Sequence, residues 1–364
     1  MIAIAKKIKG YSVVKPEDAP AATADVSPSY RDDADRRLRL VDVPKPLTAS
    51  LRWAKRPRLA VGNPAWTYMV QSPDHRFGVV IGHIQNGVAH PFEVWAIGEA
   101  PRGLTAIARS LSMDMRSSDR GWLRRKLESL AECPGEPFDM TMPDGVLVRV
   151  PSEVAAFARL VLYRCEELGA FEAKEGTPIL DALLSRREPK TTGDGGLSWY
   201  VDIANPSTGD DFTLFVKEVI LPTGKRRPLS LWLAGRYPRS LDGLCKIVSL
   251  DLQVVEAEWV FRKLQQLRST EEVNGSFLAP VPGQEKSAFF PSTVAYIAEL
   301  LLHRCRALGM EAEGSPALVE VAETVAEPAK DLPKGGLCGD CGAYAVYTAS
   351  GCSTCGACGA SACG

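Results

Sequence analysis

The sequence lacks the features that direct a chain to a membrane or to nucleic acid. No stretch approaches the roughly twenty consecutive apolar residues of a membrane-spanning helix, and the amino-terminal MIAIAKKIKG has only five apolar residues before its lysines. An excess of one charge is also missing, because 43 Lys and Arg oppose 44 Asp and Glu and leave a net charge of -1. We therefore expect a cytoplasmic protein whose partners include neither a membrane nor a nucleic acid.

Histidine and phosphate-binding motifs are scarce. Four histidines are present, with no ligand or triad spacing among them: His75, His83, His90 and His303. The glycine-containing stretches 193–196 and 223–225 are typical of turns, because neither has the glycine-to-lysine spacing of a phosphate loop. The sequence thus offers neither a histidine-based catalytic centre nor a P-loop.

Cysteine is sparse in most of the chain and concentrated at its end. With 364 residues, 45% of them hydrophobic, the chain can bury a substantial core in two or more units. Four of the ten cysteines are scattered: Cys133, Cys165, Cys245 and Cys305. The other six lie in the last 27 residues: Cys338, Cys341, Cys352, Cys355, Cys358 and Cys363. In a reducing compartment such a cluster favours metal binding or redox chemistry over structural disulfides.

Hydrophobic periodicity predicts strands and helices from Trp66 onward. The runs AWTYMV, RFGVVIGHI and PFEVWAIG favour an antiparallel sheet, and RGLTAIARSLSMDM and WLRRKLESL favour amphipathic helices. The clearest helix runs from Ser152, placed as an N-cap, to Gly169, placed as the C′ residue. Its apolar stripe directs Cys165 toward the core, where a buried thiol is expected rather than a catalytic one.

A long part of the sequence occurs twice. HPFEVWAIGEAPRGLTAIARSLSMDM, which begins at His90, matches RPLSLWLAGRYPRSLDGLCKIVSLDL, which begins at Arg227, at a displacement of 137 residues. This alignment pairs Trp95 with Trp232, Arg102 with Arg239, Asp114 with Asp251, and Trp122 with Trp259. The later helix recurs at a displacement of 140 and pairs Cys165 with Cys305. A period of this length indicates a duplicated domain rather than a solenoid.

We therefore predict an α+β fold of two duplicated modules in tandem, each a small antiparallel sheet with helices, followed by a small zinc ribbon. The predicted divisions are an extended segment of little independent structure (1–60), a first module (61–185), a second module (195–312), a linker (313–334) and a cysteine-rich tail (335–364). The repeated Arg102/Arg239 and Asp114/Asp251 are expected in structural caps or ion pairs. Four tryptophans are expected in the sheet cores: Trp66, Trp95, Trp199 and Trp232.

The tail contains Cys-x-x-Cys knuckles with the spacing of a zinc site. Cys338-Gly-Asp-Cys341 is followed, after ten residues, by Cys352-Ser-Thr-Cys355-Gly-Ala-Cys358. Two such knuckles supply four thiolates in tetrahedral geometry, and the glycines permit the tight turns. The first pair forms one half-site, and either Cys352 with Cys355 or Cys355 with Cys358 completes it. A purely structural zinc ribbon is about as well supported as any further role.

The number of tail cysteines favours a role beyond zinc binding. If zinc takes four ligands, Cys338, Cys341, Cys352 and Cys355, then Cys358 and Cys363 remain near the end of the chain, with four residues between them. Two free thiols on a segment of small residues can reach another site and reduce a disulfide by thiol exchange. Zinc-bound thiolates also exchange, so this division into four structural and two redox sulfurs is the simplest assignment.

Taken together, these stretches resemble the carboxy-terminal third of long adenosylcobalamin-dependent (class II) ribonucleotide reductases. The resemblance covers nearly everything from about residue 60 and rests on the two repeats, GLSWYVDIANPSTGDDFTLFVKEV, FPSTVAYIAELLLHR and the six-cysteine tail. The family's repeated module is often named for a Thr-Ser-Cys-Pro-Asp signature, which this sequence does not preserve.

The resemblance implies part of a ribonucleoside-diphosphate reductase rather than a complete enzyme. The family's catalytic α/β barrel is absent, and no cysteine here has the Asn-x-Cys-x-Glu context of the thiyl-forming residue. A separate barrel chain is therefore implied as partner, with adenosylcobalamin in that chain, zinc in this one, and a thioredoxin-like or other dithiol as reductant. Cys358 and Cys363 would deliver electrons to the barrel in deoxyribonucleotide synthesis.

Two other interpretations stay open. The chain could be a zinc-ribbon interaction or regulatory protein that binds a reductase or nucleic acid without redox activity. It could also be a decayed fragment, which a neighbouring gene for a barrel-only chain would argue against.

Overall fold

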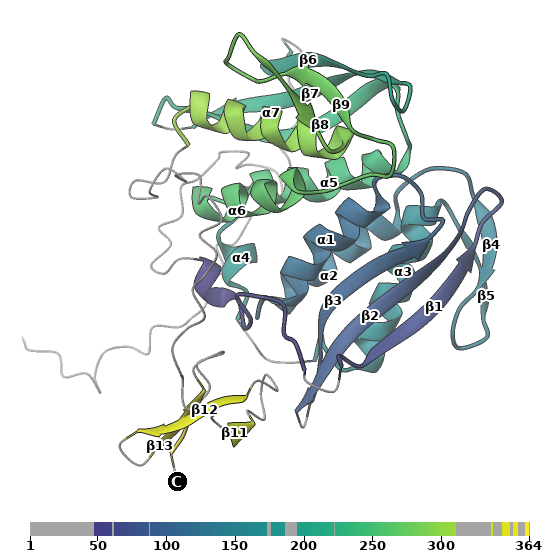
Figure 1. Ribbon diagram of the computed structural model, residues 1–364, viewed down its shortest axis with the longest axis vertical. Coiled ribbons are helices and arrows are strands. Elements are labelled where there is room, and N and C mark those ends of the chain that lie inside the picture. The colour runs from purple at the N-terminus through teal and green to yellow at the C-terminus, as the bar shows by residue number, and fades with distance from the viewer. Residues whose placement is uncertain are drawn as a thin grey trace, which may run out of the picture. The chain divides into compact units, whose positions relative to one another are not determined.

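The computed structural model describes residues 47–59, 62–86, 88–172, 176–185, 195–221 and 223–310, and the strands of the tail, 336–337, 344–349, 352–355 and 361–363. These residues form a mixed α+β protein of small antiparallel sheets and helices (Figure 1), which confirms the predicted fold class. Every described residue belongs to one compact unit within Leu38–Gly364. In this described part, no helix has the length and apolarity needed to cross a bilayer.

The first half, residues 65–167, begins with an antiparallel sheet in the order β1-β2-β3. Its elements are β1 (Ala65–Gln71), β2 (Arg76–Asn86), β3 (Val88–Gly98), α1 (Leu104–Met115), α2 (Arg120–Ala131), β4 (Phe138–Thr141), β5 (Leu147–Val150) and α3 (Glu153–Glu167). They include the three strands and three helices predicted from periodicity. In β2, Phe77, Val79 and Ile81 are fully buried, so every second residue of the strand fills the core.

The second half, residues 198–307, shows the same order of elements. They are β6 (Ser198–Asn205), β7 (Asp210–Ile220), β8 (Arg226–Arg236), α5 (Ser240–Leu252), α6 (Ala257–Arg268), β9 (Phe277–Pro280), β10 (Ser287–Phe290) and α7 (Thr293–Ala307). The matched tryptophans take the same place in their sheets, because Trp95 of β3 pairs with β2 and Trp232 of β8 pairs with β7.

The helices α3 and α7 begin with the same cap. The hydroxyl oxygens of Ser152 and Ser292 accept hydrogen bonds from the backbone N–H groups of Ala155 and Ala295, which satisfies donors that a helix start leaves free. Gly169 follows α3 with a φ of 66°, the left-handed conformation of a C′ residue. The caps predicted for the first of these helices are thus confirmed.

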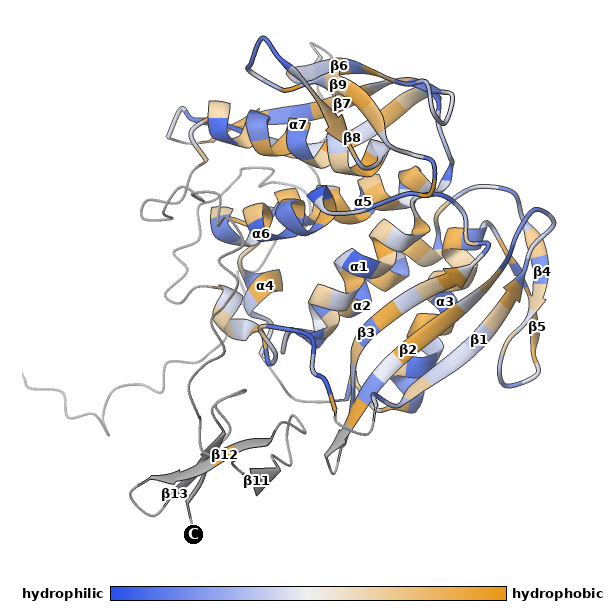
Figure 2. Cartoon of the chain, viewed as in Figure 1, coloured by the Kyte–Doolittle hydropathy of each residue, from blue (hydrophilic) through white to orange (hydrophobic). Residues whose placement is uncertain are grey.

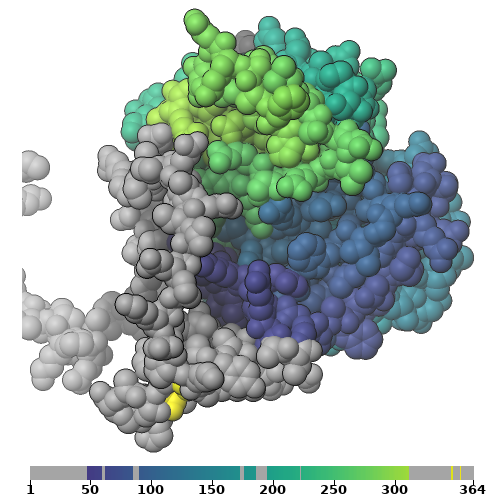
Figure 3. Space-filling model, viewed as in Figure 1, coloured from purple at the N-terminus to yellow at the C-terminus, as the bar shows by residue number. Residues whose placement is uncertain are grey.

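The two halves pack through their helices. α1 contacts α5 and α6, and α2 contacts α5. One apolar cluster holds residues of both halves, such as Ile107 in α1 and Ile247 in α5, and Figure 2 shows apolar residues along the strands and helices of both. In Figure 3 the surfaces of the first half (blue) and the second half (green) meet along a continuous border.

The described part of the predicted extended segment 1–60 belongs to the folded body. It contains the 3-10 helix η1 (Leu47–Ser50), and Leu47 and Trp53 are buried at 2% and 7% exposure. The next residues form a β-bridge with the loop after α1. For residues 47–59 the expectation of little structure is therefore corrected, since their apolar side chains have a core to enter.

A second short helix, α4 (Pro178–Asp181), shares one small apolar cluster with η1 and with residues of both halves. The Asp119 carboxylate at the start of α2 accepts two backbone N–H groups of α4, at 2.8 and 3.0 Å. The Glu256 carboxylate at the start of α6 accepts the backbone N–H of Leu47 in η1, at 2.8 Å. Each half thus uses the acid that begins its second helix to bind one short helix, α4 or η1.

Candidate functional site

The described backbone of the cysteine tail forms a four-stranded antiparallel sheet. Its strands are β11 (Gly336–Leu337), β12 (Tyr344–Ala349), β13 (Cys352–Cys355) and β14 (Ser361–Cys363), and they pair in that order. In the register of β13 and β14, the Cα atom of Cys352 lies opposite that of Cys363. A predicted zinc ligand and a predicted relay residue are therefore neighbours along the backbone.

The predicted site residues of the tail stay predictions. Three of them lie outside the described residues: Cys338, Cys341 and Cys358. Three are described only as strand backbone: Cys352, Cys355 and Cys363. Where side chains are described, no group of three or more His, Cys, Asp and Glu residues is placed to hold a metal ion.

The four cysteines of the body are unsuited to thiol exchange. All are free and buried: Cys133, Cys165, Cys245 and Cys305. Burial raises the pKa of Cys165 and of Cys305 to about 12, and it also raises the pKa of Cys133 and of Cys245. Because the thiolate is the reacting form, a protonated and inaccessible thiol is inert. Cys165 is buried, as predicted.

Four charged residues meet between the halves and form a buried cluster. The Nζ of Lys126 lies 3.0 Å from Asp114 Oδ2 and 2.7 Å from Asp251 Oδ2. The Nζ of Lys263 lies 2.6 Å from Asp114 Oδ1. Each of these side chains is at most 2% exposed. Two positive and two negative charges balance, which makes their removal from water tolerable.

Trp122 and Trp259 complete the buried cluster with one contact from each half. The indole N–H of Trp122 donates to Asp114 at 2.9 Å, and that of Trp259 donates to Asp251 at 3.2 Å. The lysine of each half lies over the tryptophan of the same half, at 4.8 and 5.5 Å from the ring centroid. The repeated aspartates thus make structural ion pairs.

The two lysines of the buried cluster have pKa values that shift in opposite directions. Burial would raise the pKa of Asp114, but the nearby lysines outweigh this effect and lower it. Burial lowers the pKa of Lys263 to about 8, because attraction to Asp114 offsets only part of the desolvation. Burial also opposes the charge on Lys126, yet the two aspartates raise its pKa. Lys263 is therefore the first of the two lysines to lose its proton as pH rises.

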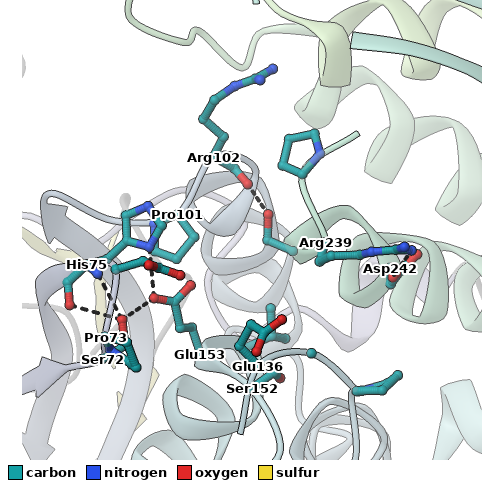
Figure 4. Close-up of a pocket in the computed structure, with 16 residues that line it drawn as sticks. Ser72, Pro73, His75, Pro101, Arg102, Glu136, Ser152, Glu153, Arg239 and Asp242 are labelled. Atoms are coloured by element: carbon teal, nitrogen blue, oxygen red, sulfur yellow. Dashed lines mark hydrogen bonds and ion pairs between the residues drawn. The ribbon is translucent and has the colours of Figure 1, made fainter. Parts of the chain in front are cut away.

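A cavity of about 470 Å³ opens between the halves, at the starts of α1, α3 and α5 (Figure 4). On one wall His75 Nδ1 lies 2.8 Å from Glu153 Oε1, and the Ser72 hydroxyl donates to the same oxygen. The Ser72 hydroxyl also lies 3.1 Å from the backbone oxygen of His75. This wall of the cavity therefore carries a serine, a histidine and a carboxylate that are linked by hydrogen bonds.

The repeated arginines differ at this cavity. Arg102 reaches into the second half and forms two hydrogen bonds to the Asp210 carboxylate, at 3.0 and 2.6 Å. The Asp210 side chain is 4% exposed. Arg239 instead stays beside Asp242 in its own half, at 3.8 Å, and is 71% exposed. Arg102 therefore links the two halves, while Arg239, which also lines the cavity, pairs within its own half.

The prediction that four tryptophans lie in the sheet cores is wrong for three of them, Trp66, Trp95 and Trp232, which are 47%, 45% and 44% exposed. Arg164 lies 3.9 Å over the Trp66 ring and Arg56 lies 5.5 Å over the Trp95 ring, so cations cover two of these indoles. The fourth, Trp199, is half-buried against the core. Strand alternation carried the missing signal, since Trp95 follows the buried Val94 and must face the other way.

Three aromatic residues form a row on the sheet of the second half, one from each strand: Tyr200, Phe215 and Trp232. The register places Phe215 opposite both of the others. Ring centroids are 6.0 Å apart from Tyr200 to Phe215 and 6.1 Å apart from Phe215 to Trp232, whose ring planes differ by 9°. Tyr200 is 64% exposed. We call these three residues the aromatic row; sequence reasoning missed it.

Comparison with known protein families, with curated proteins and with solved structures finds no match to this chain.

Proposed function

We propose that this chain is the accessory, carboxy-terminal part of a class II ribonucleoside-diphosphate reductase and works in the cytoplasm with a separate barrel chain. The distribution of thiols carries the proposal. The body cysteines are buried, with raised pKa values, whereas six cysteines gather in the last 27 residues. Electron delivery by thiol exchange therefore falls to the tail.

The relay we propose uses Cys358 and Cys363 as its dithiol. One thiolate attacks the disulfide left in the barrel after turnover and forms a mixed disulfide, which the second thiol resolves. The barrel then holds two thiols and the tail holds a disulfide, which an external dithiol of the thioredoxin type reduces. Two electrons and two protons pass in each exchange.

Zinc is proposed to fix the fold of the tail through Cys338, Cys341, Cys352 and Cys355, because a glycine-rich segment of this size cannot build a core of its own. The Cα register of Cys352 and Cys363 supports a close association of the two cysteine sets, since directly opposite residues are near neighbours in an antiparallel pair. Exchange between zinc-bound and free thiols is an alternative form of the same relay.

The two halves are proposed to be duplicated modules that serve as the docking body. This is supported by their shared order of elements, by the matching pairing of Trp95 and Trp232, and by the Asp–Trp–Lys set that each half contributes to the buried cluster. A duplicated domain that packs on its own copy explains all three observations.

The test replaces both relay cysteines, Cys358→Ser and Cys363→Ser, in the full chain assayed with the cobalamin-loaded barrel chain. Turnover driven by a thioredoxin-type protein should be lost, because the tail can no longer carry electrons. Zinc content should stay unchanged, and a small dithiol that enters the barrel directly should restore turnover. Cys245→Ala, which alters a buried thiol, serves as the control and should retain activity.

Unchanged protein-driven turnover in the double variant would remove the relay. Loss of zinc from the same variant would move these sulfurs into the metal site. The aromatic row and the cavity favour a second candidate function, an interaction protein without redox activity. Binding to the barrel chain with no effect of either cysteine substitution would support that function instead.

A further inference from the structure

The sheet of the second half has one face in the core and one face in solvent. Leu214 and Val216 of β7 are buried, and Phe215 between them points to the opposite face. The aromatic row therefore stands on the outer face. Large aromatic side chains gathered on an exposed surface are typical of a binding site, because contact with water is unfavourable for them.

The equivalent face of the sheet in the first half carries different residues. At the same register its row is Thr67, Val80 and Trp95, so only one member is aromatic. The guanidinium of Arg56 lies over the Trp95 ring at 5.5 Å and donates to Glu93 at 3.0 Å. The position of Glu93 corresponds to Ser230 in the second half, at the displacement of 137. An ion pair thus covers part of the outer face of the first sheet, and the equivalent position of the second sheet, Ser230, has no carboxylate to form the same pair.

Charge around the aromatic row identifies the kind of partner. Strand alternation places two acids and two bases on the same face: Asp202, Asp211, Lys217 and Arg236. Single-stranded nucleic acid binds where aromatic rings lie in a positively charged groove, and these charges sum to zero. Exposed aromatics without net charge match the core of a protein interface, which is rich in Tyr, Trp and Phe.

We propose that the aromatic row is the surface by which this chain docks onto the barrel chain, against an uncharged apolar surface of that partner. The proposal rests on the function proposed above. The tail follows the second half in sequence, so docking through that half keeps the tail attached to the docked module. Aromatic residues in interface cores contribute a large share of binding energy, so the row should dominate affinity.

The test rebuilds the row of the first half in the second, with Tyr200→Thr and Phe215→Val in the full chain. We expect the Kd for the purified barrel chain, measured by calorimetry, to rise by about tenfold or more, as truncation of interface aromatics typically produces. Reductase turnover should need a correspondingly higher concentration of this chain, and its rate at saturation should not change. The unfolding midpoint should fall only slightly, because Tyr200 is 64% exposed and Phe215, which is half-buried, is replaced by another apolar residue.

A matched control removes exposed apolar side chains from the first sheet. Met69→Thr with Ile97→Ala changes residues that are 60% and 48% exposed, and the Kd should stay at the wild-type value. An unchanged Kd for the Tyr200→Thr/Phe215→Val variant would overturn the docking surface and leave the proposed function standing. A wild-type chain that does not bind the barrel would overturn both.

Two further outcomes would assign the aromatic row elsewhere. Self-association of the wild-type chain that disappears in the Tyr200→Thr/Phe215→Val variant would make the row an interface between copies. Binding of a single-stranded oligonucleotide, lost in the same variant, would make it a nucleic-acid surface. Either result overturns docking to the barrel chain. The Cys358→Ser/Cys363→Ser variant should bind the barrel normally, which separates docking from electron transfer.

Discussion

The two halves share buried polar residues but differ in the residues that they expose to solvent. Each contributes an aspartate, a tryptophan and a lysine to the buried cluster, and the hydrogen bond from tryptophan to aspartate and the contact of lysine with tryptophan recur within each half. On the outer face of the hairpins they diverge. Asp139 and Arg149 form an ion pair at 3.2 Å between β4 and β5, while the same places in β9 and β10 hold Leu278 and Phe289, which are 57% and 78% exposed.

Packing of the two halves against each other constrains their buried positions more than their exposed ones. A buried ion loses its partner when any one member of a cluster changes, so the buried positions of both halves must change together or not at all. Exposed positions can change independently, because water solvates the side chain in either case. The fold therefore does not require the exposed apolar side chains at these places of the second half.

Substitutions in the buried cluster should reduce stability most. Asp114→Asn should lower the free energy of unfolding by about 3–5 kcal/mol, because Lys126 and Lys263 are left buried with one carboxylate. Asp251→Asn should lower it by about 1–3 kcal/mol, since Asp251 pairs with Lys126 alone. Urea unfolding of both variants measures the difference. Equal losses would mean that the two aspartates are equivalent.

The arginine pair gives the next largest contrast. Arg102→Ala should lower the free energy of unfolding by about 2 kcal/mol, because the Asp210 carboxylate, 4% exposed, keeps only neutral partners such as the Thr293 hydroxyl. Arg239→Ala should change it by less than about 0.5 kcal/mol, since Arg239 is 71% exposed. Thermal and urea unfolding of the two variants side by side would reveal a comparable loss, which would contradict the contrast.

The same contrast has a pH dependence. Burial opposes the charge on Asp210, but its hydrogen bonds with Arg102 outweigh this and lower its pKa below the usual 3.8. A carboxyl with a lowered pKa in the folded state stabilises the fold above pH 3.8 and loses that contribution as pH falls through the folded value. Arg102→Ala should therefore flatten the acid limb of the stability curve, and Arg239→Ala should leave it steep.

Local patterns in the sequence were sufficient to predict the elements. Ser152 and Gly169 mark the ends of α3 because capping depends on a few neighbouring residues. The strands of the first sheet followed from alternation, which acts within a strand. The matched aspartates and arginines were found by the repeat, although the asymmetry of Arg102 and Arg239 depends on which half each side chain reaches.

The aromatic row could not be predicted, because it depends on register. Tyr200, Phe215 and Trp232 are separated by 15 and 17 residues, and a shift between Lys217 and Glu218 alters the alternation of β7 against β8. The four tryptophans were assigned to the core on hydrophobicity alone, which ignores the polar edge of an indole. The zinc ligands and the relay pair were predicted from spacing, and they stay predictions.

Substitutions on the outer face of the second hairpin should change stability least. Leu278→Asp with Phe289→Arg installs the ion pair of the first half and should change the free energy of unfolding by less than about 0.5 kcal/mol, because both positions are exposed. Differential scanning calorimetry would measure this. If the variant instead unfolds several degrees earlier, Leu278 and Phe289 support the fold, and their exposure says nothing about a partner.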